Sequence, residues 1–216
     1  MLRLIRLGRA ALLAGLLTGI LSACTITSEK PLLAASEGAA PLPDAFVFYP
    51  YEKSQDGYIR SGDPPATFHR QGHVYVGRNL PDTKGEIDVR LVPVGGDLLL
   101  AAQEPSTTNA IYGFARFADG VLTLALAPDR QTARAIERER HAAMPKARKA
   151  LAGLGISPET SAITLTSRAA LDYLAGMYVA GRLPMSPPVV GYISEDPEAV
   201  APARLVPAGH HWIKVP

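Results

Sequence analysis

A strand with a period of two between residues 86 and 94 is the feature that most constrains the fold. Ile87, Val89 and Leu91 alternate with Glu86, Asp88 and Arg90 over this stretch. A period of two places one set of side chains on each face of a β-strand. The segment therefore predicts a strand that is apolar on one face and solvated on the other.

Two glycine turns extend this strand into a sheet. Gly95-Gly96 (or Gly96-Asp97) follows it, and Asp119-Gly120 separates two further apolar runs. An Asp-Gly pair between such runs favours a type I′ hairpin turn, because glycine accepts a positive φ at no steric cost. Residues 73–127 are therefore predicted to form an antiparallel meander of about five strands.

The chain changes character after the meander. Asp129 and Ser167 are residues of the type that caps helices at their N-termini. Helices are predicted for Arg130–Ala143, for residues 145–153 after the break at Pro145, and for Arg168–Gly181. Two short strands are predicted near the C-terminus, at Val189–Ile193 and His211–Val215. Strands that precede helices predict an α+β fold, in which the antiparallel meander is followed by two or three helices packed on one face.

Composition excludes several classes of protein. With 47% hydrophobic and 19% charged residues, the chain of 216 residues can bury a core. A single Cys excludes a disulfide framework and any zinc site built on several cysteines. Three of the 22 Lys and Arg lie in the first nine residues, which leaves 19 against 20 Asp and Glu. A net charge of −1 argues against a nucleic-acid binder.

The N-terminus has the anatomy of a signal peptide. Arg3, Arg6 and Arg9 precede Ala10–Ile20, an apolar run with no charge. This run is shorter than the ~20 residues that a transmembrane helix needs. A charged region followed by a short apolar region is typical of a secretory signal.

The apolar run ends in Leu21-Ser22-Ala23-Cys24, which resembles the lipobox of bacterial lipoproteins. The resemblance implies that lipoprotein processing enzymes attach diacylglycerol to the Cys24 thiol, cleave the chain before this residue and then acylate its amine. Two or three acyl chains give stable membrane anchoring. The alternative is an ordinary secretory signal in which Cys24 follows an A-x-A-like cleavage site.

These features predict three parts of the chain. Residues 1–23 form the lipoprotein signal peptide, 24–45 the lipidated Cys and a flexible tether, and 46–216 a single α+β domain. The tether is inferred from its Ala, Ser and Pro content. The resemblance also implies a lipid-anchored protein of the cell membrane. Thr25, where retained lipoproteins carry Asp, indicates the outer membrane, facing the periplasm.

Four histidines are the candidate binding residues. His69 and His73 are four apart, but in a strand this spacing places them about 13 Å from each other. His210 and His211 adjoin the single Trp212, and one of them could meet His69 or His73 across a sheet. No carboxylate completes a metal-site pattern, so neither a metal nor a cofactor is expected. The alternative is that the histidines are exposed and that Trp212 packs on the core.

Two further groups have open interpretations. The segment Arg130–Lys149 is basic and could touch an anionic membrane surface or an acidic partner, or it is a solvated helix face with ion pairs such as Arg134–Glu137. The three tyrosines of residues 49–58 could line a groove, although core packing is favoured.

Catalytic signatures are absent from the sequence. It contains no Gly-x-Ser-x-Gly, His-Glu-x-x-His, Ser-x-x-Lys or glycine-rich phosphate loop. We therefore expect no catalytic residues and a binding or structural role, as an accessory subunit of a complex in the cell envelope. The alternative is a periplasmic hydrolase with a dispersed active site, which a pocket joining His69 or His73 to a carboxylate and a Ser would favour. A flat apolar patch or an uncovered strand edge would favour the binding module.

Overall fold

A computed structural model describes residues 25–34, 36–80, 85–104, 107–126, 128–129, 131–142, 145–157 and 162–216. Strands dominate this part of the chain, and three short helices accompany them. The strands are β1 (Ile26–Ser28), β2 (Ala45–Ser54), β3 (Gly57–Arg60), β4 (Ala66–Gln71), β5 (Val74–Arg78), β6 (Ile87–Val94), β7 (Asp97–Gln103), β8 (Ala110–Ala118), β9 (Val121–Ala125), β10 (Leu154–Ile156), β11 (Ile163–Leu165), β12 (Val189–Ser194), β13 (Arg204–Ala208) and β14 (His211–Val215). The helices are α2 (Thr132–Ala142), α3 (Pro145–Ala152) and α4 (Arg168–Val179).

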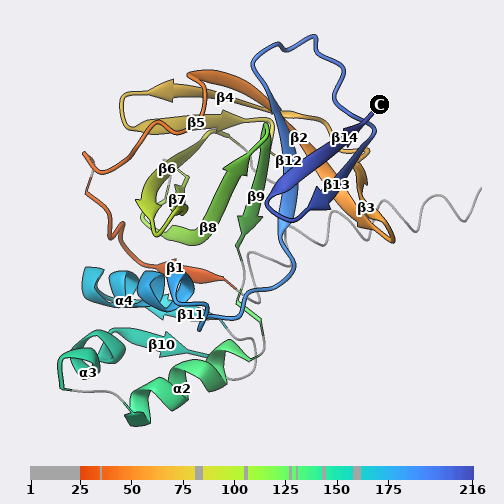
Figure 1. The fold of residues 1–216 in the computed structure, drawn as a ribbon. Helices are drawn as coiled ribbons and strands as arrows, with labels where there is room; N and C mark the ends of the chain where they lie inside the picture. The colour runs from red at the N-terminus through yellow and green to blue at the C-terminus, as the bar shows by residue number, and fades with distance from the viewer. Residues whose placement is uncertain are drawn as a thin grey trace, which may run out of the picture.

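Eight of the strands close into an antiparallel barrel (Figure 1). Their order is β2-β4-β5-β6-β7-β8-β9-β12, and β12 pairs with β2 to complete the circle. Tyr192 of β12 lies opposite Tyr49 on one side and Val121 on the other. Because the barrel is closed, each of these eight strands is paired with a neighbour on both sides.

Side chains from all eight strands fill the barrel. In β7, Leu98, Leu100 and Ala102 belong to this interior cluster, whereas Leu99 and Ala101 face outward into a second cluster. The rings of Phe46 and Phe68 stack inside the barrel with centroids 4.9 Å apart. The interior is therefore a packed core.

Two layers cover the outer wall of the barrel. The three helices pack with β1, β10 and β11 against β7 and β8, in a cluster that contains Leu171, Leu174 and Met177 of α4. The β13–β14 hairpin covers β2, β9 and β12, and buries Leu205 there. These layers meet over β8 and β9, where the candidate site lies.

The predicted meander is confirmed as the consecutive strands β5 to β9. Asp119 and Gly120 have φ values of 54° and 74°, the positive pair that a type I′ turn requires. All three predicted helices are present, and the Ser167 hydroxyl accepts a hydrogen bond from the Ala170 amide at 3.2 Å. The two predicted C-terminal strands correspond to β12 and β14.

The predicted α+β fold, an antiparallel meander followed by helices packed on one face, is confirmed only in part. The fold is mostly β, and eight of its strands close into a barrel. The turn pairs of residues 51–71, Asp56-Gly57 and Ser61-Gly62-Asp63-Pro64-Pro65, favour a loop, yet this segment contains the end of β2 and all of β3 and β4. In β4 only Ala66 is buried, so its residues lack the apolar alternation that marks a strand. The long-range pairing of β12 with β2 has no local signal either.

The flexible tether predicted within residues 24–45 is also contradicted where the structure describes this segment. β1 lies between β8 and β11, and Leu33 and Leu42 are buried. Prolines fix φ but do not prevent neighbouring leucines from packing, which is why composition misled here. Residues 1–23 and Cys24 lie outside the described residues.

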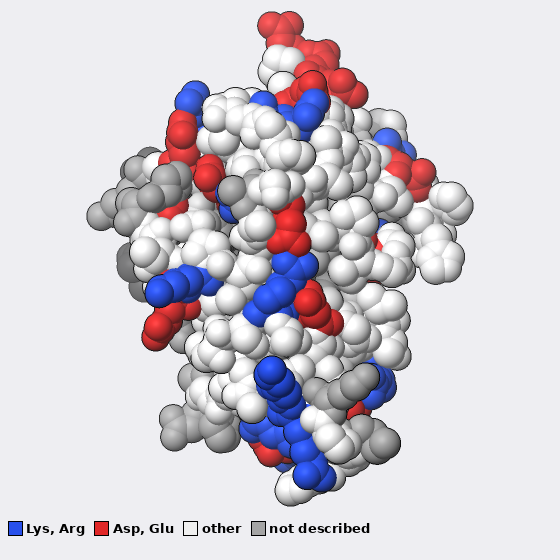
Figure 2. All heavy atoms as spheres, turned by 90° about the vertical axis from the view of Figure 1, so that its left-hand side faces the viewer, with Lys and Arg blue, Asp and Glu red and all other residues white. Residues whose placement is uncertain are grey.

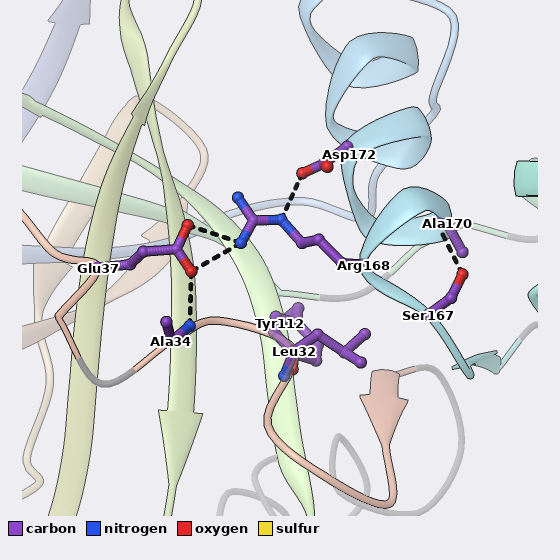
Figure 3. A network of polar contacts seen from close by, with 8 residues as sticks. All are labelled: Leu32, Ala34, Glu37, Tyr112, Ser167, Arg168, Ala170 and Asp172. Carbon is purple, nitrogen blue, oxygen red and sulfur yellow. Dashed lines mark hydrogen bonds and ion pairs between the residues drawn. The ribbon is translucent and has the colours of Figure 1, made fainter.

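Polar contacts hold this segment against the barrel and α4 (Figure 3). The Tyr112 hydroxyl accepts from the Leu32 amide at 2.8 Å, and Arg168 donates to Glu37. Further along, the Ala39 amide donates to the Leu91 carbonyl at 2.7 Å. None of the helices in the described residues is long and apolar enough to span a membrane.

Candidate binding cleft

A cleft of about 550 Å³ opens on the outer wall of the barrel, where the helical layer and the β13–β14 hairpin meet. Its floor is formed by outward-facing residues of β7, β8 and β9. The end of α4 and the chain after it form one wall, and the turn of the β13–β14 hairpin forms the other. The cleft therefore lies between elements that are distant in sequence.

Three side chains form a polar cluster in the cleft. Nε and Nη2 of Arg116 donate to the two carboxylate oxygens of Asp97 at 2.7 and 3.0 Å. The Tyr178 hydroxyl donates to Oδ2 of the same carboxylate at 3.0 Å. The Asp97 side chain is only 11% exposed. These contacts hold the guanidinium in one orientation at the floor of the cleft.

Local backbone geometry explains how Asp97 and Tyr178 come together. Asp97 begins β7 directly after the Gly95-Gly96 turn, and Tyr178 lies in the last turn of α4. A Cβ added at Gly95 would lie 2.5 Å from Cγ1 of Val179, and Gly95 also has a φ of 55°. Only glycine allows this turn to approach the end of α4 so closely.

The electrostatics of the cluster favour the protonated forms of Arg116 and Tyr178. The hydrogen bonds and charge of Asp97 raise the pKa of Arg116. Burial, together with the neighbouring Asp97 carboxylate, raises the pKa of Tyr178 to about 12. Tyr178 is therefore a stable hydrogen-bond donor and Arg116 a permanent cation.

Aromatic rings flank the polar cluster. Phe114 and Tyr178 stack with ring centroids 3.8 Å apart and planes at 2°. On the other wall, Trp212 packs edge-on to Tyr58 at 5.8 Å. The Asp119 carboxylate fixes this wall, because it accepts from the Trp212 amide at 3.1 Å.

Arg116 gives the cleft a charged hydrogen-bond donor. Nη1 of Arg116 has no partner among the described residues, and Asp97 already accepts from two side chains. Thr123, Ser186 and His210 also line the cleft. The arrangement suits a group with an apolar body and a hydrogen-bond acceptor such as a carboxylate.

The four histidines are not brought together. The His69 ring lies 2.7 Å from the Gln71 amide nitrogen, and the His73 ring contacts the Gly38 carbonyl at 3.2 Å. His211 contacts Asp119 at 3.2 Å, and only His210 lines the cleft. Within the described ranges, no hydrogen bond joins two of them.

Neither a metal centre nor a His paired with a Ser or Thr hydroxyl is found in the described part of the chain. No group of three or more His, Cys, Asp or Glu side chains there could hold a metal ion. The histidine contacts in the same residues go to an amide, a carbonyl and a carboxylate, and none goes to a Ser or Thr hydroxyl. Trp212 is half-buried against the core, and Tyr49, Tyr51 and Tyr58 are buried there, as favoured from the sequence.

The basic helices α2 and α3 form one end of the molecule, where Lys and Arg side chains gather on the surface (Figure 2). Glu137 pairs with Arg140 at 2.5 Å rather than with Arg134. Glu139 accepts from Arg182 and from the Tyr173 hydroxyl. Arg134 and Arg138 are exposed, which fits a solvated helix face.

The cluster of Asp97, Arg116 and Tyr178 was not identified from the sequence. The available signal was an acidic residue in β7, Asp97, and a basic residue in the neighbouring β8, Arg116, both at positions that face outward. Leu98 lies opposite Ala115, so the same register continues to Asp97 and Arg116. This register depends on the connection between the strands, which the sequence pattern does not define.

Comparison of the chain with protein-family models, with curated proteins and with solved structures found no match. The function must therefore be argued from the site.

Proposed function

We propose that this protein is a bacterial envelope lipoprotein, anchored through Cys24, that acts as a binding module in a complex of the cell envelope. The anchor is supported by Leu21-Ser22-Ala23-Cys24 after an apolar run flanked by arginines. The outer membrane, facing the periplasm, is the proposed location. The binding role is supported by the cleft.

The observation that carries the binding role is the position of Arg116. Asp97 uses two of its guanidinium nitrogens, and the third is directed to no other described residue. The stacked pair of Phe114 and Tyr178 lies beside it, and Trp212 lines the opposite wall. The Arg116 side chain is 55% exposed and therefore open to a partner. Aromatic and Arg residues are enriched among the groups that dominate binding energy once an interface covers them.

The proposed ligand is a segment of another envelope protein. An apolar side chain of this partner would occupy the space between Trp212 and the Phe114–Tyr178 stack. A carboxylate next to it would accept from Arg116 in a charge-assisted hydrogen bond. A cleft of about 550 Å³ is within the usual range for such sites.

Two measurements test this function. Intact-mass analysis of the protein from membranes should show acyl groups on Cys24, and Cys24→Ser should abolish them. Cross-linking of the lipidated protein in native membranes, followed by mass spectrometry, should identify one partner.

Variants of the cleft make the second measurement specific. Arg116→Ala and Trp212→Ala should each reduce recovery of the partner at least tenfold. Arg78→Ala is the control, because Arg78 pairs with Glu86 on the surface between β5 and β6 and lies outside the cleft. Equal recovery with all three variants would contradict the role of the cleft. Turnover of an ester or amide substrate would favour the periplasmic hydrolase instead.

A further inference from the structure

The chain is fixed in the fold from the residue that follows the proposed lipidation site. Thr25 is only 5% exposed, and its carbonyl accepts from the Ile163 amide at 2.9 Å. Ile26 is fully buried and pairs with Tyr112 of β8 on one side and with Ile163 of β11 on the other. β1 therefore has a hydrogen-bonded neighbour along each edge.

Contacts after β1 keep this segment in place. The Ser28 hydroxyl lies 3.1 Å from the Tyr112 hydroxyl, and Glu37 binds Arg168 of α4. Leu42 enters the interior cluster of the barrel, where its carbonyl accepts from the Tyr75 hydroxyl at 2.7 Å. These contacts are spread over the segment, so β1 is not held by a single interaction.

Covalent geometry then limits the distance between domain and anchor. Consecutive Cα atoms are only ~3.8 Å apart, whereas a flexible linker of about 20 residues has a root-mean-square length of about 25 Å. We infer that the anchored domain has no tether and rests directly on the bilayer, with the lipid headgroups beside the start of β1. This inference rests on the proposed lipidation of Cys24.

The pairing of β1 identifies the side of the molecule that faces the bilayer. Thr164 of β11 lies opposite Thr27, which places it about 8 Å from Thr25 at ordinary strand spacings, and its side chain is exposed. Val200, in the loop after β12, is 91% exposed. That loop lies beyond the barrel, at the far end from β1 (Figure 1). Thr164 therefore marks the proposed membrane side, and Val200 marks the side away from it.

Spin labels at these two positions test the inference. Cys24 is the only native Cys, and its thiol is consumed by the lipid, so Thr164→Cys and Val200→Cys each give a single labelling site. The lipidated proteins are reconstituted in vesicles of phosphatidylethanolamine with phosphatidylglycerol and a nickel-chelating lipid. Nickel at the headgroups should accelerate the relaxation of the label at position 164 several-fold more than that of the label at position 200.

A linker variant provides the matched control. Insertion of about 12 Gly and Ser residues between Cys24 and Thr25 adds a root-mean-square reach of about 20 Å. The difference between the two labels should then fall to near zero. Equal relaxation at both positions without the insertion, or a difference that the insertion leaves unchanged, would overturn the inference.

Two readouts separate the possible failures. Absence of acyl mass on the purified protein contradicts the proposed lipidation itself, before any vesicle is made. Hydrogen exchange of the Ile26 and Thr27 amides in the reconstituted protein reports on β1. Slow exchange is expected, whereas fast exchange would show that β1 leaves the sheet on anchoring and would overturn the absence of a tether.

Discussion

Arg168 and Glu37 are 131 positions apart in sequence, and Nη1 of Arg168 donates to both carboxylate oxygens of Glu37, at 2.6 and 2.7 Å. Nε of the same guanidinium donates to Asp172, one turn further along α4. The Glu37 carboxylate also accepts from the Ala34 amide at 2.5 Å. This cluster ties the chain after β1 to the first turn of α4 (Figure 3).

The cluster predicts a stability that depends on pH. Hydrogen bonds from Arg168 hold the pKa of Glu37 below its ordinary value, so the contribution is fully present above that value, about 4.3. It is lost as the pH falls through the lower pKa of the folded state. Glu37→Gln should cost below about 1 kcal/mol at pH 7, since the side chain is 31% exposed to solvent. Urea unfolding at pH 7 and pH 3 measures the difference in free energy of unfolding between the wild type and Glu37→Gln. This difference should be smaller at pH 3. A difference that does not change with pH would contradict the role given to the Glu37 carboxylate.

The Asp119-Gly120 turn predicts the cost of a β-branched residue. Gly120 has a φ of 74°, a region that sterically excludes valine. Gly120→Val should lower the free energy of unfolding by about 1–2 kcal/mol. Gly120→Asn is the control, because Asn tolerates the left-handed region, and its loss should be smaller. Equal losses in thermal unfolding would mean that side-chain bulk matters rather than φ.

Closure of the barrel depends on the absence of a side chain at Gly191. A Cβ there would lie 2.0 Å from Cε2 of Phe48, inside the barrel. Gly191→Ala should therefore destabilise the protein by about 1–3 kcal/mol through overpacking. Adding Phe48→Leu should recover part of this loss, and additive losses in the double variant would argue against the contact.

The matched control for Gly191 is Gly176, which is exposed in α4 and would meet nothing within 4 Å. Gly176→Ala should stabilise the protein by up to about 1 kcal/mol, because alanine favours the helix. Melting temperatures of both variants are measured together. If Gly176→Ala destabilised the protein, something other than the available space would restrict this position of α4.

The raised pKa of Tyr178 predicts a second pH dependence of the free energy of unfolding. Burial and the Asp97 carboxylate raise its pKa to about 12, so its contribution is complete below the ordinary value of about 10 and is lost between these two values. Tyr178→Phe keeps the ring that stacks on Phe114 but removes the hydrogen bond to Asp97. The loss should be about 1–2 kcal/mol at pH 7. Chemical unfolding of the wild type and Tyr178→Phe at pH 7, 10 and 11 measures this loss. A loss that grows with pH would contradict the raised pKa of Tyr178.

Local patterns predicted the elements better than their assembly. The alternation around Leu91 and the turn at Asp119-Gly120 are short-range signals, and both are present in the structure. Closure depends on Tyr192 of β12 reaching Tyr49 of β2, a pairing that no local pattern encodes. The same reason explains why the histidines were preferred as candidates over Arg116, whose partner Asp97 is defined only by strand register.

The place of β12 in the chain also determines when the barrel can form. β12 begins at Val189, close to the end of a chain of 216 residues, yet it joins the first barrel strand to the last strand of the meander. Until β12 is available, no strand joins β2 to β9, and the interior cluster of the barrel is open on that side. Closure of the barrel therefore waits for the final eighth or so of the sequence, as expected for a topology dominated by non-local contacts. Under the export proposed above, this order would let the barrel close only after nearly all of the chain has crossed the membrane.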